Sequence, residues 1–134
     1  MSIKNLLPGK IGLGGAPLGN MFRAIPEDEA HATVSEAWNL GVRYFDTAPL
    51  YGYGLSEIRM GEALSQYPRD EYVLSIKVGR IMLDEMEDPA KRDFGEKGGL
   101  FEHGLKNKIL NDYSADATLR SIEDSLKRLK TDRL

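Results

Sequence analysis

The strongest constraint on the fold of this chain is a regular alternation of strand-like and helix-like segments joined by short turns. Strand-like runs lie at residues 11–13, 42–46 and 72–78, and helix-like runs at residues 26–40 and 56–64 lie between them. A strand–helix–strand–helix–strand order with short connections is typical of a parallel sheet whose crossovers are helices. We therefore expect an α/β fold built on three parallel strands.

Local signals set the predicted ends of the helices. Pro26 suits the first position of the first helix, and Gly41 suits the left-handed residue that ends it. Ser56 is a candidate N-cap for the second helix, and Ser114 is one for a third helix. In the third helix four apolar residues recur at helical spacing and predict one buried face: Leu119, Ile122, Leu126 and Leu129.

Three segments lie outside this alternation. Pro8-Gly9 is a tight-turn signal, so residues 2–13 are predicted to form a small hairpin that leads into the first strand. Residues 79–112 are rich in charge and glycine without a sustained period, which predicts a long irregular loop that is functional or mobile. Residues 131–134 resemble a turn into a fourth strand, at which the sequence ends. All of these segments belong to one predicted domain, residues 1–134.

Composition excludes several classes of function. The formal net charge of -3 argues against a nucleic acid or an anionic membrane as a partner, because either would favour a basic surface. The sequence has no cysteine, which excludes disulfides, thiolate catalysis and cysteine-based metal sites. Its two histidines, His31 and His103, are far apart, and we expect no metal site. We see no signal-peptide core and no apolar run of membrane-spanning length, so the expected compartment is the cytoplasm.

A cluster of glycines after the first strand suggests a dinucleotide-binding loop, in which glycines let a pyrophosphate approach a helix N-terminus. After Gly12 and Gly14, however, the third glycine of the G-x-G-x-x-G pattern falls at Pro17. Asp46 also lies well beyond the spacing of about 20 residues expected of the ribose-binding acid. A Rossmann or flavodoxin-like module is therefore disfavoured, and it would require a helix that begins directly at Gly19.

Asp46 and Lys77 are placed to meet. Each lies at the carboxyl end of a predicted strand, and neighbouring parallel strands are only about 4.8 Å apart, so the two side chains can reach each other. This edge of the sheet is where α/β barrels and open sheets place their sites. A structural salt bridge is the alternative interpretation, because a charge on a buried strand is costly unless it is paired.

Tyr51 follows Asp46 by five residues, in a loop marked by Pro49 and Gly52 that leads to the same edge. A tyrosine phenol has an ordinary pKa of about 10, and a nearby ammonium group favours its ionised form. Lys77 could supply that ammonium while Asp46 keeps it charged and oriented. Tyr51 could then exchange a proton with a carbonyl or alcohol oxygen. The alternative is that Tyr51 packs its ring over the rim of the barrel or sheet.

The sequence around this trio resembles the aldo-keto reductase family. The similarity to the family's signature covers Val42-Arg43-Tyr44-Phe45-Asp46-Thr47-Ala48-Pro49-Leu50-Tyr51-Gly52, followed by Ser56-Glu57 and Gly61-Glu62-Ala63-Leu64. Ile76-Lys77-Val78-Gly79 resembles the second signature of the family. Within the family, residues 16–20, 77–80 and 112–114 are most similar to the group of pyridoxal 4-dehydrogenase and L-fucose (D-threo-aldose) dehydrogenase.

The resemblance implies the N-terminal part of a (β/α)8 TIM barrel, with about three βα units that end before strand 4. It also implies hydride transfer between NAD(P)(H) and a small polar carbonyl or alcohol, such as a sugar or pyridoxal. Tyr51 would be the proton donor or acceptor, Lys77 would lower the pKa of its phenol, and Asp46 would support Lys77 near the nicotinamide ribose. Three residues after the first strand would approach the nicotinamide end of the cofactor: Gly14, Gly15 and Ala16.

Two features depart from the family pattern. The fourth catalytic residue of the family is a histidine after the fourth strand, and neither His31 nor His103 is placed to replace it. A complete barrel takes about 250 residues, so we expect the chain to be the front portion of an enzyme and to bind the cofactor weakly or not at all by itself. The alternative is an inactive half-barrel that has a structural role or associates with a second copy through open sheet edges.

Overall fold

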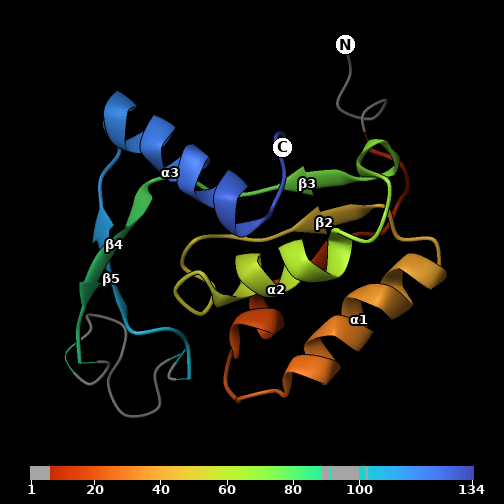
Figure 1. The fold of residues 1–134 in the computed structure, drawn as a ribbon, viewed down its shortest axis with the longest axis horizontal. Helices are drawn as coiled ribbons and strands as arrows, with labels where there is room; N and C mark the ends of the chain where they lie inside the picture. Colours follow the sequence, from red (N-terminus) through yellow and green to blue (C-terminus); the bar gives the residue numbers. More distant parts are fainter. Residues whose placement is uncertain (1–6, 89–90, 92–99, 102) are drawn as a thin grey trace.

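The computed structural model is built on a small parallel sheet, which confirms the α/β fold expected from the sequence. The strands follow the order β1 (Leu13–Gly14), β2 (Tyr44–Asp46) and β3 (Val73–Ser75), and both neighbouring pairs are parallel (Figure 1). The structure describes residues 7–88, 91, 100–101 and 103–134.

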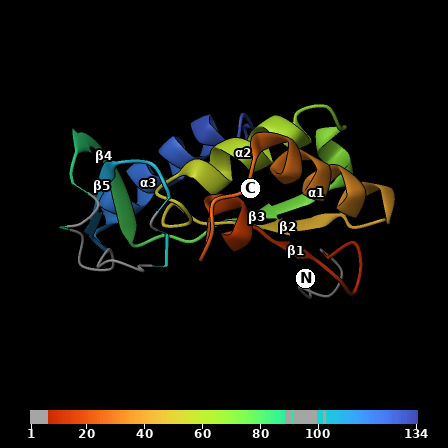
Figure 2. The same cartoon turned by 90° about the horizontal axis from the view of Figure 1, so that it is seen from below.

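Two helices cover one face of this sheet. α1 (Glu27–Asn39) connects β1 to β2, and α2 (Leu55–Leu64) connects β2 to β3, so each connection is a helical crossover. Figure 2 shows both helices on the same side of the strands. The side chains between the helices and the sheet form the main hydrophobic core: Leu18, Ile25, Ala30, Val34, Phe45, Met60, Ala63, Leu64, Tyr72, Leu74 and Leu129.

Side chains along the strands alternate between the two faces of the sheet. Phe45 and Leu74 are 0% and 2% exposed, because they pack into the core beneath the helices. Asp46 and Ser75 follow them on the opposite face, are half-buried, and stand in register with each other. None of the described helices covers that face (Figure 2). The two polar side chains therefore lie together where the strands end.

The two helices begin differently from the sequence prediction. Pro26 is the N-cap of α1 rather than its first helical residue. The N-cap of α2 is Gly54, whose φ of +95° favours glycine, so the predicted cap at Ser56 is wrong. Ser56 lies inside the first turn and is fully buried. Instead of capping the helix, its hydroxyl donates a hydrogen bond in the protein interior to the carbonyl of Gly15 at 2.6 Å.

Residues 79–112 are not wholly the irregular loop that the sequence predicted. They contain two antiparallel strands, β4 (Arg80–Met86) and β5 (Asn107–Asn111), which form a second sheet. The hydrophobic pattern hid these strands because the small sheet is only partly covered. Ile81 is buried, whereas Leu110, its partner across the two strands, is 44% exposed.

The third predicted helix, α3 (Ala115–Arg128), begins where expected, because the Ser114 hydroxyl accepts a hydrogen bond from a backbone amide of the first turn at 3.2 Å. The predicted buried face is only partly correct. Leu119 is 63% exposed, whereas Ser121 and Ser125 are buried. Small side chains let α3 lie close to β4, where the Ser121 hydroxyl donates to a backbone carbonyl at 3.1 Å. The rest of the predicted face is at least half-buried: Ile122, Leu126 and Leu129.

The two terminal segments for which we predicted strands, before β1 and after α3, contain none among their described residues. Residues 7–12 form no strand, and the rest of the predicted hairpin, residues 2–6, lies outside the described residues. Residues 131–134 form no strand either. A 3-10 helix (Ala16–Gly19) follows β1 and the next α-helix begins only at Glu27, which excludes a nucleotide-binding module whose helix begins at Gly19. Among the described helices, none has the length and apolar character needed to cross a bilayer.

Candidate active site

Asp46 and Lys77 meet at the carboxyl edge of the sheet, as the sequence predicts. Asp46 ends β2, and Lys77 follows the end of β3 by two residues, because β3 is shorter than the predicted strand 72–78. The Nζ atom of Lys77 lies 2.6 Å from Oδ2 of Asp46 and also donates to the carbonyl of Thr47 at 3.3 Å. The Lys77 side chain is 48% exposed and that of Asp46 is 31% exposed, so the pair is accessible to a ligand.

A hydrogen-bond chain that the sequence analysis missed orients the Asp46 carboxylate. The Ser75 hydroxyl donates to Oδ1 of Asp46 at 2.7 Å. Because a hydroxyl has a single proton, Ser75 accepts a hydrogen bond from the Tyr44 phenol, 2.9 Å away. The strand register places Ser75 directly opposite Asp46, and that register is the signal that could have revealed the chain. One carboxylate oxygen is thus fixed by a hydroxyl and the other by an ammonium group.

Tyr51 lies beside this pair. Nζ of Lys77 is 4.9 Å from the centre of the Tyr51 ring, within the range of a cation–π interaction. Burial alone would lower the pKa of the Lys77 ammonium, but its hydrogen bonds to Asp46 and Tyr51 raise that pKa above the ordinary value of 10.5. Lys77 is therefore a stable cation next to a phenol near neutral pH. The structure brings the three predicted catalytic residues together, and their roles remain predictions.

Glycine contacts fix the turn that carries Tyr51. A Cβ atom on Gly19 would lie 2.4 Å from the carbonyl carbon of Tyr51, and one on Gly52 would lie 2.5 Å from the oxygen of Gly19. The two backbone segments can touch only because neither residue has a side chain. Gly52, Tyr53 and Gly54 then follow with φ angles of +65°, +57° and +95°. This tight left-handed path determines where the Tyr51 side chain leaves the backbone.

A hollow of about 160 Å³ lies next to the trio. Its lining combines Tyr51 and Lys77 with Ala48, Pro49, Leu50, Val78 and Arg80. Pockets that enclose a small-molecule ligand usually measure about 300–1,000 Å³. The hollow is therefore the size of one part of such a pocket.

The three predicted cofactor positions after β1 differ in their surroundings. A Cβ atom built on Gly14 meets nothing within 4 Å, so the backbone at the end of β1 is open to a ligand beside Asp46. Gly15 is closed, because its Cβ would lie 2.7 Å from the Ser56 hydroxyl. Ala16 is half-buried at the start of the 3-10 helix. Of the three, Gly14 has the surroundings expected of a position approached by a ligand.

Glu57, a second carboxylate of the signature run, lies away from the hollow and between α2 and α3. Its Oε2 atom accepts from Nε of Arg128 at 2.5 Å, and the two side chains are 0% and 12% exposed. Burial raises the pKa of the Glu57 carboxyl above its ordinary value of 4.5, and Arg128 offsets the rise only in part. Among the described residues, none forms a hydrogen bond of ordinary geometry with Oε1 of Glu57. The nearby Ser125 hydroxyl nevertheless lowers the pKa of the Glu57 carboxyl, as Arg128 does.

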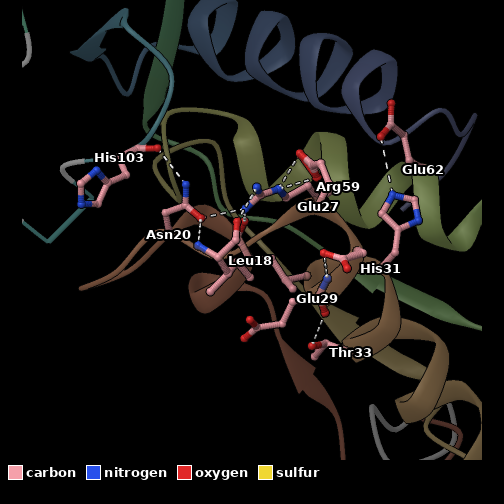
Figure 3. A network of polar contacts seen from close by, with 11 residues as sticks. Leu18, Asn20, Glu27, Glu29, His31, Thr33, Arg59, Glu62 and His103 are labelled. Atoms are coloured by element: carbon pink, nitrogen blue, oxygen red, sulfur yellow. Dashed lines mark hydrogen bonds and ion pairs between the residues drawn. The ribbon is translucent and has the colours of Figure 1, made fainter.

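Arg59 is the centre of another buried network, drawn in Figure 3. Its Nε atom donates to both carboxylate oxygens of Glu27, at 2.9 and 2.8 Å. One terminal nitrogen donates to the carbonyl of Leu18 at 2.9 Å and to Oδ1 of Asn20 at 2.8 Å, and the other donates to the carbonyl of Ile25 at 3.1 Å. The network thereby holds the connection between β1 and α1 against α2.

The two histidines do not line the hollow. His31 lies on α1 with Nε2 3.7 Å from a carboxylate oxygen of Glu62, and His103 is exposed and contributes its carbonyl to Asn20 (Figure 3). Within the part of the chain that the structure describes, no group of three or more histidine, aspartate or glutamate residues is arranged to hold a metal ion.

Comparison with known proteins identifies the family of the chain. The sequence model of the Aldo/keto reductase family matches residues 10–134. The chain is 41% identical over 125 residues to D-threo-aldose 1-dehydrogenase of Pseudomonas sp, which covers 92% of this chain and 37% of the relative. It is 38% identical over 122 residues to pyridoxal 4-dehydrogenase of Microbacterium luteolum, which covers 89% of this chain and 35% of the relative. Both belong to the group that the sequence motifs resemble.

Solved structures give the same result. The aldo-keto reductase from Klebsiella pneumoniae in complex with NADPH matches with a TM-score of 0.60 at 26% identity, covering 92% of this chain and 32% of that one. The chain spans about a third of the length of the curated relatives it matches. Its fold is therefore part of a (β/α)8 barrel, as the resemblance implied.

Proposed function

The chain belongs to the aldo/keto reductase family, and from that premise we propose that the protein transfers hydride between NAD(P)(H) and a small polar carbonyl or alcohol. In this proposal Tyr51 is the proton donor or acceptor, Lys77 is the cation beside it, and Asp46 holds that cation. One observation carries the proposal: Nζ of Lys77 lies 2.6 Å from the Asp46 carboxylate and 4.9 Å from the centre of the Tyr51 ring.

The chemistry follows from the charges of the trio. Lys77 stays protonated because Asp46 and Tyr51 stabilise its ammonium, and the ammonium in turn favours the ionised phenol. In reduction the Tyr51 phenol gives its proton to the carbonyl oxygen of the substrate, and in oxidation the ionised phenol takes the proton of the alcohol. Ser75 keeps the Asp46 carboxylate from turning away from Lys77. The proton exchange therefore needs no movement of the charged pair.

Gly14 and Asp46 are best placed to hold the nicotinamide end of the cofactor, which supplies or accepts the hydride when it is bound. Gly14 fits this role because its backbone is open, and Asp46 stands next to it across the strand register. The Asp46 carboxylate keeps acceptor capacity for a ribose hydroxyl, since two hydrogen bonds occupy only part of its lone pairs. Gly15 and Ala16 continue the same stretch of backbone.

We propose a sugar or a pyridoxal-like molecule as the substrate. The names of the relatives, an aldose dehydrogenase and a pyridoxal dehydrogenase, support this class. The hollow is lined by Lys77 and Arg80 together with the apolar residues Ala48, Pro49, Leu50 and Val78. A few polar residues within an apolar lining are typical of a site for a small molecule.

Steady-state kinetics of the protein in its full natural length, with aldose and pyridoxal substrates and both nicotinamide cofactors, tests the proposal. The Tyr51→Phe variant should lose about 100-fold or more in kcat, because it lacks the proton that is transferred. Its affinity for NAD(P)H, measured by fluorescence titration, should match that of the wild type.

Tyr67→Phe is the matched control. The Tyr67 ring stacks on Trp38 at 4.0 Å and does not line the hollow, so loss of its hydroxyl should leave kcat unchanged. Equal turnover by Tyr51→Phe and the wild type would contradict the role given to Tyr51. Absence of turnover in the wild type as well would favour the half-barrel with a structural or self-associating role.

A further inference from the structure

The chain between β4 and β5 returns to the turn that carries Tyr51. We call its described residues there the docking segment: Leu100, Phe101, His103, Gly104 and Leu105. The amide of Leu105 donates to the carbonyl of Gly52 at 2.9 Å, and the amide of Phe22 donates to the carbonyl of Leu100 at 2.9 Å. Both bonds use the backbone of the docking segment, so its path is tied to the turns near Asn20 and Tyr51.

Gly104 lets the docking segment lie directly on the peptide that follows Tyr51. A Cβ atom on Gly104 would lie 2.7 Å from both the carbonyl carbon and the oxygen of Gly52. Gly52 in turn touches the backbone of Gly19. Three backbone segments from distant parts of the sequence therefore meet at glycines around the Tyr51 turn.

Phe101 is the side chain that the docking segment places against Tyr51. The two ring centres are 5.8 Å apart with a tilt of 34°, and Phe101 is only 6% exposed. Phe101 is not a member of the main hydrophobic core, so its burial comes from contacts around the docking segment. The Tyr51 ring thus contacts both the Phe101 ring and the Lys77 ammonium. Aromatic pairs at this separation attract each other beyond their loss of exposed surface.

Asn20 anchors the docking segment from the other side (Figure 3). Its Oδ1 atom accepts from Arg59 at 2.8 Å and from the amide of Ile25 at 3.0 Å, which fixes the orientation of the side-chain amide. Its Nδ2 atom then points to the carbonyl of His103 and donates to it at 2.8 Å. Asn20 is buried, and the buried Arg59 holds it in place. The position of the docking segment is therefore set by a rigid network outside the hollow.

We propose that Phe101 is a positioning residue for Tyr51, held in place by Asn20 and Gly104. Packing against Phe101 restricts the Tyr51 ring so that the phenol stays beside Lys77 and faces the hollow in one orientation. The inference rests on the proposed function of Tyr51. It extends that function by making a segment of the β4–β5 connection part of the active site.

Two variants test this role through different atoms. Phe101→Ala removes the ring that contacts Tyr51. Asn20→Asp keeps the Oδ1 acceptor for Arg59 and Ile25 but replaces the donor to His103 with an oxygen, so it should release the docking segment without touching either ring. Gly9→Ala is the control, because a Cβ there meets nothing within 4 Å. Phe101→Leu, which restores most of the volume, should recover part of any loss.

The first readout is kinetic and uses the protein in its full natural length. Phe101→Ala should lower kcat by about 10- to 100-fold, the effect expected when a reacting group is misplaced. Asn20→Asp should lower it in the same direction by less. In both variants the pH profile of kcat should shift and the affinity for NAD(P)H should stay constant.

The second readout does not depend on turnover. The chain has 6 tyrosines, and with 13C-labelled tyrosine the resonance of Tyr51 is assigned by its loss in Tyr51→Phe. In Phe101→Ala this resonance should move toward that of a solvent-exposed tyrosine, while the other tyrosine resonances keep their positions. An unmoved Tyr51 resonance and an unchanged pH profile, even in a less stable variant, would overturn the inference. An active Tyr51→Phe would instead overturn the proposed function, and the resonance would still decide the role of Phe101.

Discussion

Two carboxylates from one stretch of the chain, Asp46 and Glu57, pair with cations in opposite surroundings. The Asp46–Lys77 pair is 31% and 48% exposed at the edge of the sheet, whereas the Glu57–Arg128 pair is 0% and 12% exposed between two helices. The nitrogen–oxygen distances, 2.6 and 2.5 Å, are nearly equal. Distance therefore does not distinguish the pair that we propose for catalysis from the pair that is buried between two helices.

The surroundings of each pair decide its role. At Glu57 burial outweighs the cation, and the pKa of the carboxyl is raised. At Lys77 the hydrogen bonds outweigh burial, and the pKa of the ammonium is raised. Water can replace either partner of the exposed pair, so a ligand can enter at little cost. No solvent reaches Glu57 to take the place of Arg128.

Removal of Arg128 should have the largest effect on stability. Arg128→Met leaves Glu57 buried without its cation, and we expect the free energy of unfolding to fall by about 3–5 kcal/mol. Urea denaturation of the chain followed by circular dichroism measures this loss. Lys127→Met, at a side chain that is 75% exposed, is the control and should change stability little. Similar losses in the two variants would mean that burial does not distinguish the two pairs.

The same pair should also give stability a pH dependence. Because the pKa of Glu57 is raised on folding, the folded state binds the proton more tightly than the unfolded state does. The contribution of Glu57 to stability is therefore fully present below its ordinary pKa of 4.5 and is lost as pH rises through the folded-state pKa. Urea denaturation at several pH values should show that Glu57→Gln lacks this decline. A steeper decline in Glu57→Gln than in the wild type would contradict the sign.

Loss of the Ser75 hydroxyl should have an intermediate effect. Ser75→Ala removes the donor to Asp46 and the acceptor for Tyr44, and we expect a loss of about 0.5–1.5 kcal/mol in the free energy of unfolding. In the full-length protein it should also lower kcat, because the Asp46 carboxylate becomes free to turn. Ser75→Thr keeps the hydroxyl and should behave as the wild type does. Full activity in Ser75→Ala would show that Lys77 alone orients Asp46.

Lys77→Met should have the smallest effect on stability and a large effect on turnover. The exposed pair is worth less than about 1 kcal/mol at neutral pH. Since the folded-state pKa of Lys77 is raised, its contribution is fully present below pH 10.5 and is lost as pH rises above that value. Thermal unfolding at pH 7 and pH 11 tests this sign. A loss at pH 7 as large as that of Arg128→Met would erase the difference between the two pairs.

The meeting of Asp46 and Lys77 could be predicted from the sequence because parallel strands bring their carboxyl ends to one edge. The same argument did not find Ser75, since a serine inside a strand carries no signal until its register against Asp46 is known. Glu57 was also missed as an interior residue. A charged residue in the first turn of a helix normally faces water, and its partner Arg128 lies 71 residues away.

The parallel sheet with its two helical crossovers was predictable because each element has its own local pattern. The β4–β5 pair was not, because its strands gain their partners only across a long connection and show little hydrophobic alternation. The buried face of α3 was partly misassigned for a related reason. Close contact with β4 selects small residues such as Ser121, which a search for apolar periodicity passes over.

In a library of random variants, functional proteins should retain glycine at both Gly19 and Gly52. Any side chain at either position collides with the backbone of the other, so no single substitution opens the contact and a double substitution makes it worse. The backbone next to Tyr51 therefore tolerates no substitution at these two glycines. A search for variants with a new substrate preference would therefore have to leave this glycine contact intact and change side chains that line the hollow instead, such as Leu50 and Val78.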